Sequence, residues 1–88
     1  MKTGTADWRA DIDALRFAVS DTGPYGFVHR LAFRTLIGFD PTPGDCLAWF
    51  EDHRAAFVAA AEKHLSDGRN FHLNSRDIRR QLRGVDPV

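Results

Sequence analysis

Residues 43–66 read PGDCLAWFEDHRAAFVAAAEKHLS, and this stretch decides the fold. Its apolar side chains recur at the spacing of one face of an α-helix, so the pattern predicts one long amphipathic helix. Thr42 supplies a helix cap and Pro43 a proline at the first helical position, while Gly68 follows the segment as a stop signal. We therefore expect a helix from about Pro43 to Ser66.

Arg54 falls inside the apolar arc of this helix. A guanidinium stays charged in proteins, so its head must reach water or a partner. In the structural interpretation its stem packs on Phe50 and its head reaches solvent or pairs with a carboxylate, for which we expect an aspartate. In the functional interpretation it is an anion-binding hook in a cleft, together with His29. The candidate partners are Asp11, Asp13, Asp77 and Glu51.

Two strands are predicted upstream of the long helix. Residues 12–19 alternate apolar and polar side chains, as do residues 27–31, in which Phe27, His29 and Leu31 share a face that we expect to point inward. The turn-forming residues 21–26 should join the two strands as an antiparallel hairpin. Residues 32–38 change to helical spacing and predict a short helix that ends at Gly38.

The remaining elements follow the long helix. Residues 71–73 predict a third, short strand, and Asn74 or Ser75 should cap a final helix that ends near Gly84. The order ββααβα predicts an α+β fold, with a small three-stranded antiparallel sheet packed against one long helix. We expect one domain over residues 9–84, a flexible lead over residues 1–8 and a loose end over residues 85–88.

Composition excludes several classes of protein. The 88 residues are 43% hydrophobic and 11% aromatic, which favours a folded domain over a disordered chain. The only cysteine, Cys46, excludes an internal disulfide and suits a reducing cytoplasm. Because there is no apolar signal core and no membrane-spanning run, we expect a cytoplasmic protein without membrane contact.

The zero net charge conceals an uneven distribution. Residues 1–62 carry six Lys or Arg and nine Asp or Glu, whereas residues 63–88 carry six and three. Four arginines of the final helix share one face, which suits nucleic-acid phosphates, although a solvated outer face is the plainer interpretation. The aromatic side chains expected of a single-strand binder are missing from this helix. The candidate basic patch comprises Arg69, Arg76, Arg79, Arg80 and Arg83.

No catalytic, metal-binding or nucleotide-binding motif is found. His53 and His64 project from similar angles of the long helix, but the helical rise separates them by about 16 Å, too far for one metal ion. Cys46 should act as a small hydrophobe. We therefore expect no metal, no cofactor and no enzymatic activity. Trp49, at the edge of the apolar arc, is a candidate association surface.

Three segments carry a family resemblance: residues 27–36 (FVHRLAFRTL), 46–54 (CLAWFEDHR) and 71–78 (FHLNSRDI). In these segments the chain resembles the bacterial family catalogued as domain of unknown function 1488, from about Phe17 to about Leu82. One departure is His29, where the second strand of that family often carries cysteine. The resemblance implies the same fold and makes Arg54 a family feature, but it implies no function, because the family has no established activity.

The leading hypothesis is a non-enzymatic binding or interaction module, with association into a homodimer left open. The alternative is a nucleic-acid-binding protein that uses the basic face of the final helix. A third hypothesis, an enzyme that uses Arg54 with His29 or His53, lacks a recognisable catalytic arrangement. A concave pocket that holds Arg54 and His29 would favour the enzyme, and a solvent-facing row of arginines would favour nucleic acid.

Overall fold

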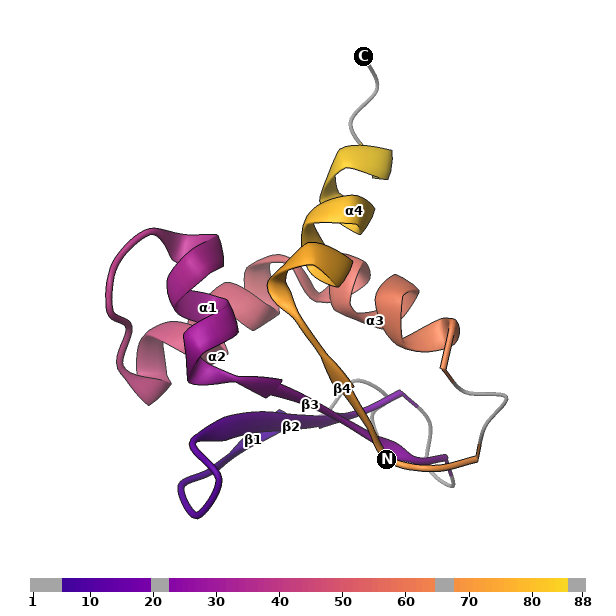
Figure 1. Cartoon of the computed structure of the whole chain (residues 1–88), viewed down its shortest axis with the longest axis horizontal. Helices are drawn as coiled ribbons and strands as arrows, with labels where there is room; N and C mark the ends of the chain where they lie inside the picture. The colour runs from indigo at the N-terminus through magenta and orange to yellow at the C-terminus, as the bar shows by residue number, and fades with distance from the viewer. Residues whose placement is uncertain (1–5, 20–22, 65–67, 86–88) are drawn as a thin grey trace.

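A computed structural model describes residues 6–19, 23–64 and 68–85 of the chain (Figure 1). Over these residues the fold is α+β, as predicted, with four helices and one four-stranded mixed sheet. The elements are, in chain order, β1 (Ala6–Arg9), β2 (Ala14–Ala18), β3 (Tyr25–His29), α1 (Arg30–Ile37), α2 (Pro43–Asp52), α3 (Arg54–Glu62), β4 (Phe71–Leu73) and α4 (Ser75–Val85).

The sheet differs from the three-stranded antiparallel sheet that we expected. Its strands lie in the order β1-β2-β3-β4; β2 is antiparallel to both of its neighbours, whereas β4 is parallel to β3. The last pair is parallel because α1, α2 and α3 carry the chain back before β4 begins, and such a crossover returns a strand in the original direction. The expected antiparallel pairing of the last strand was wrong.

The additional strand, β1, comes from the segment that we expected to be a flexible lead over residues 1–8. It pairs with β2 across a turn at residues 10–13, in which Asp13 has a positive φ of 52°. Asp7 accepts a hydrogen bond from Arg16 at 3.0 Å, and Trp8 packs against the core, so both sides of the strand are held. Residues 1–5 and 86–88 lie outside the described residues, while Val85 of the expected loose end belongs to α4.

The single long helix expected over residues 43–66 was also wrong, because α2 and α3 meet at His53. His53 has φ −122° and ψ 27°. Its Nδ1 lies 2.9 Å from the carbonyl oxygen of Trp49, and its ring stacks on the Trp49 indole with 3.9 Å between centroids. A side chain that enters the backbone hydrogen-bond ladder in this way interrupts a helix. α3 ends at Glu62, and the expected end at residue 66 lies outside the described residues.

Other helix ends follow the local sequence. Thr42 and Asp45 form the capping box that starts α2, with each side chain accepting from the other residue's backbone N–H. Gly38 ends α1 with a φ of 99°, a conformation that glycine adopts without steric cost. None of the described helices is long and apolar enough to span a membrane.

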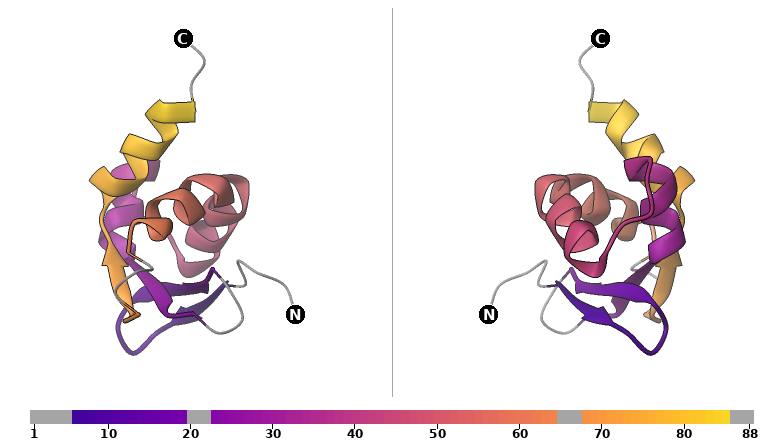
Figure 2. Two further views of the ribbon diagram at one scale, coloured as in Figure 1. Left: turned by 90° about the vertical axis from the view of Figure 1, so that its right-hand side faces the viewer. Right: turned by 90° about the vertical axis from the view of Figure 1, so that its left-hand side faces the viewer.

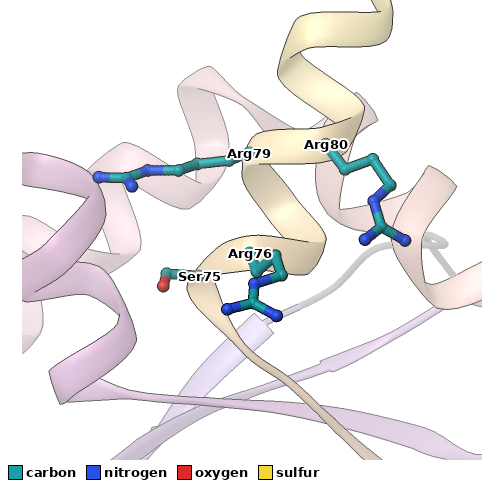
Figure 3. Close-up of a pocket in the computed structure, with 4 residues that line it drawn as sticks. All are labelled: Ser75, Arg76, Arg79 and Arg80. Carbon is teal, nitrogen blue, oxygen red and sulfur yellow. The ribbon is translucent and has the colours of Figure 1, made fainter.

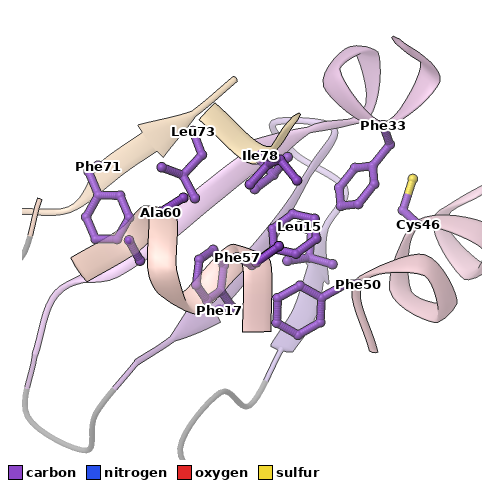
Figure 4. Packing of buried hydrophobic residues seen from close by; sticks show 13 residues of the cluster. Leu15, Phe17, Phe33, Cys46, Phe50, Phe57, Ala60, Phe71, Leu73 and Ile78 are labelled. Atoms are coloured by element: carbon purple, nitrogen blue, oxygen red, sulfur yellow. The ribbon is translucent and has the colours of Figure 1, made fainter. Parts of the chain in front are cut away.

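The core lies between one face of the sheet and the helices (Figure 4). Phe17 of β2 lies near its centre, with its ring centroid 5.3 Å from that of Phe50 and 6.2 Å from that of Phe57. Gly26 of β3 leaves room for Phe17 and Phe71 to meet edge to face at 6.4 Å. Burial of such rings dominates the stability of a small domain. The buried hydrophobic residues are Ala14, Leu15, Phe17, Val28, Phe33, Cys46, Phe50, Ala56, Phe57, Ala60, Ala61, Phe71, Leu73 and Ile78.

The opposite face of the sheet is not covered by any of the described helices, as both views in Figure 2 show. Along β3, Gly26 and Val28 are buried, whereas Phe27 is half-buried and His29 is exposed. We expected Phe27 and His29 to face inward, and this was wrong, because the buried side of the strand carries the neighbouring residues Gly26 and Val28. Leu31, expected on the same face, lies on α1 and is 62% exposed.

Candidate functional site

α4 begins at Ser75 because Asn74 and Asp77 cap it reciprocally. The Asp77 N–H donates to Asn74 Oδ1 at 2.9 Å, and the Asn74 N–H donates to the Asp77 carboxylate at 3.1 Å. Ile78 is fully buried and holds one side of the helix on the core. Arginines exposed on this helix are Arg76, Arg79 and Arg80, which we call the α4 arginines.

A hollow of about 450 Å³ lies against the first two turns of α4, lined by Ser75 and the α4 arginines (Figure 3). Arg79 extends to α1, where its Nη2 donates to the carbonyl oxygen of Thr35 at 3.1 Å. Arg76 and Arg80 slope toward the beginning of α4, as side chains on helices do. Arg79 thus points away toward α1, whereas the guanidiniums of Arg76 and Arg80 lie toward the end of the helix whose dipole favours anions.

Several arginines elsewhere in the described residues are held by carboxylates. Arg16 donates to Asp7 at 3.0 Å, and Arg30 pairs with Asp13 at 2.9 Å and also with Asp40. Hydrogen bonds to these carboxylates raise the pKa of both guanidiniums. No carboxylate of the described residues forms an ion pair with the α4 arginines, so their positive charge is available to a ligand.

The structure does not bring the five arginines of the predicted basic patch together. Arg69 precedes β4 and α4 follows it, so roughly 20 Å of extended chain, at about 3.3 Å per residue, lies between Arg69 and the start of α4. Arg83 belongs to α4, but its side chain is not among those that the structure describes. The α4 arginines are therefore the part of the patch that the structure describes as lining one hollow, and the place of Arg83 in the patch stays a prediction.

Arg54 and His29, the predicted anion or ion-pair site, lie apart. Arg54 is the first residue of α3 and pairs with Glu51 of α2, and its guanidinium carbon lies 5.8 Å from the centre of the Phe50 ring. His29 lies on the opposite, open face of the sheet. Of the four candidate partners, Glu51 is the one that this ion pair uses, and the three candidate aspartates have other partners. Asp11 pairs with Arg9, Asp13 with Arg30, and Asp77 caps α4.

Trp49, the candidate association surface, is half-buried and packs at the border of the core. Its ring meets Phe33 edge to face at 6.3 Å and Phe57 at 5.8 Å, and it stacks on His53. These contacts leave less of the indole for a partner than the sequence suggested. The large hydrophobic residues exposed on the described surface are Ile12, Tyr25, Leu31 and Phe39.

Cys46 is fully buried, and its burial raises the pKa of the thiol to about 11. The thiol is therefore protonated at neutral pH and packs as a small hydrophobe, as expected. Among the described residues, no three His, Cys, Asp or Glu side chains are placed to share a metal ion. That the chain has no cofactor and no enzymatic activity stays a prediction.

Sequence reasoning missed a row of rings on the open face of the sheet. The His72 ring stacks between those of Phe27, at 5.4 Å and 28°, and His29, at 5.2 Å and 3°. We call these three side chains the ring row. Val28 is the signal that would have revealed the ring row. A β-branched residue suits the packed side of a sheet, and an inward Val28 places Phe27 and His29 on the outer face.

Comparison of the chain with protein-family models, with curated proteins and with solved structures found no match. The resemblance to domain of unknown function 1488 therefore stays a prediction. Since these comparisons supply no function, a function can be proposed only from the chemistry of the described surface.

Proposed function

We propose that this chain is a non-enzymatic binding module whose ligand is nucleic acid, held at its phosphates by the α4 arginines. The observation that carries the proposal is three exposed guanidiniums around one hollow, with no ion-pair partner among the described carboxylates. A guanidinium suits phosphate because its planar N–H donors can bind two oxygens together. The expected homodimer stays a separate prediction, which light scattering tests.

The three guanidiniums are expected to contribute unequally. Arg79 already donates to Thr35 of α1, so its main contribution is to hold α4 beside that helix. Arg76 and Arg80 have no hydrogen-bond or ion-pair partner among the described residues, and they lie one turn apart on the same side of α4. We therefore expect Arg76 and Arg80 to make the phosphate contacts, while Arg79 positions the helix.

Fluorescence anisotropy with labelled oligonucleotides, repeated over a series of salt concentrations, tests the proposal. Each phosphate contact contributes about 0.7–0.9 to the slope of log affinity against log salt, so Arg76→Gln/Arg80→Gln should reduce the slope by about 1.4–1.8. Arg9→Gln is the matched control for each single substitution. It removes the same charge at β1, the edge of the sheet opposite β4, and should leave the slope unchanged.

Two results would contradict the proposal. One is the absence of binding to any oligonucleotide at low salt, where phosphate contacts are strongest. The other is a salt slope that Arg9→Gln reduces by half as much as the double variant does, since an equal effect per removed charge would reflect total charge and not the α4 arginines. Circular dichroism spectra of all variants confirm that the exposed substitutions leave the fold intact.

A further inference from the structure

Resting on the proposed function, we propose that the bound nucleic acid is single-stranded and that the ring row on the open face of the sheet stacks on its bases. Phe27, His29 and His72 come from adjacent strands, because the parallel register places Phe27 beside His72. His29 and His72 are exposed and Phe27 is half-buried. The two imidazole planes lie within 3° of each other and that of Phe27 is inclined by 28° to His72, so another flat ring can extend the row from His29.

The open face around the ring row suits a polyanion. The outward positions of β3 and β4 carry Tyr25 and the three members of the row, none of them acidic. On β2, Arg16 lies with its guanidinium carbon 4.7 Å from the centre of the Tyr25 ring. The nearest outward carboxylate in the register, Asp7 of β1, is paired with Arg16. A phosphate backbone therefore meets rings and cations on this face, without an unpaired carboxylate from the described strands.

The ring row also continues toward the α4 arginines. Both β3 and β4 run toward α4, so His29 is the end of the row nearest that helix, and only Asn74 separates β4 from α4. In Figure 2, β4 and α4 lie along one margin of the molecule, with α2 and α3 on their inner side. Arg69 is exposed beyond the other end of β4. Cations thus flank the rings at both ends of β4.

This combination favours unpaired bases over a duplex. Proteins that bind single strands join a cationic path for the phosphates to aromatic side chains on which bases stack, and every base offers a flat face for this purpose. In a duplex the bases are already stacked on one another, so a ring row at the surface cannot reach them. The rings that seemed to be missing from the arginine-bearing helix are supplied by the neighbouring strands.

The test measures the affinity of the full chain for labelled oligo(dT), oligo(U) and a duplex of equal length at one salt concentration. His29→Ala and His72→Ala should each weaken single-strand binding by about 5- to 150-fold, the equivalent of about 1–3 kcal/mol per stacked base. Duplex binding and the salt slope should not change. Phe39→Ala, which removes an exposed ring outside the row, is the matched control and should bind like the wild type.

The outcomes separate this proposal from the one on which it rests. If the histidine variants bind oligo(dT) and oligo(U) like the wild type while Arg76→Gln/Arg80→Gln reduces the salt slope, the phosphate site stands and base stacking is refuted. If no oligonucleotide binds at low salt, both proposals are refuted. If the histidine variants differ from the wild type in molecular mass in light scattering but not in affinity for single strands, the face binds a second copy of the chain and stacking is refuted. Weaker single-strand binding by the histidine variants, with duplex binding unchanged, supports stacking, and the more tightly bound of oligo(dT) and oligo(U) identifies DNA or RNA.

Discussion

The addition of one methyl group at Gly26 is a sharp test of the packing described above. Gly26 lies on the inner side of β3, where an added Cβ would be 2.7 Å from Cε2 of Phe71 and 2.8 Å from Cε1 of Phe17. Carbon atoms in a protein interior pack at about 3.5–4.0 Å, so Gly26→Ala forces at least one of these rings to move.

The rings have little room to move, and this sets the expected magnitude. Phe17 is held by Phe50 and Phe57 as well as by Phe71. Overpacking of a core costs about 1–3 kcal/mol, whereas a strand gains about 0.5–1 kcal/mol when alanine replaces glycine. The net loss in the free energy of unfolding should be about 1–2 kcal/mol, which lowers the melting temperature of a domain of this size by about 4–16 °C.

Thermal unfolding followed by circular dichroism measures this loss, and the chain offers a matched control. Gly44 occupies the first turn of α2, where an added Cβ would meet only Thr42 Oγ1 at 3.7 Å. The same glycine-to-alanine change should therefore stabilise the protein there, by up to about 1 kcal/mol. Phe71→Leu in the Gly26→Ala background removes one of the obstructing ring atoms and should recover part of the loss.

A Gly26→Ala variant at least as stable as the wild type would refute the close approach of the two rings. So would a double variant in which the two substitutions add independently, because additivity means that the sites do not touch. If both glycine variants instead lost stability equally, the cost would come from the substitution itself and not from the crowding at β3.

Two further predictions concern residues that the sequence singled out. The side chains of the Arg54–Glu51 ion pair are 39% and 53% exposed, so Glu51→Gln should change the free energy of unfolding by less than about 1 kcal/mol in urea titrations; a larger loss would show that this pair contributes more than a surface ion pair does. Cys46 should not react with a thiol reagent at pH 8 unless the protein is unfolded, and rapid native-state labelling would contradict its burial. Because burial raises its pKa from 9.0 to about 11, the unfolded thiol ionises first, so stability should fall between those pH values in the wild type and not in Cys46→Ala.

Local signals in the sequence predicted the elements with strong periodicity or caps. The start of α2 was found from Thr42 and Pro43, and that of α4 from Asn74 or Ser75 as its cap; the structure shows that Asn74 caps α4, together with Asp77. The strands predicted over residues 12–19 and 71–73 correspond to β2 and β4, whereas the one predicted over residues 27–31 overlaps β3 only at residues 27–29. The α4 arginines were recognised from their helical spacing, which places them on one side of a helix.

Apart from the break at His53, which involves the nearby Trp49, what the sequence did not predict depends on contacts between distant residues. β1 carries one large apolar side chain, Trp8, and only its pairing with β2 makes it a strand. The break at His53 depends on where one imidazole points. The ring row requires both the phase of β3 and the neighbouring position of β4, and neither is encoded locally. The loss of Arg69 from the basic patch likewise follows from the direction of β4.

The parallel pairing of β3 with β4 has a consequence for the chain while it is being synthesised. Residues 30–70 separate the two strands, so β3 leaves the ribosome about 2–8 s before β4 if synthesis adds about 5–20 residues per second. During this interval the β1–β2–β3 meander can form, but the outer edge of β3 has no strand beside it. Free strand edges pair readily with other chains. The nascent protein is therefore most exposed to aggregation in the seconds before its last strand emerges.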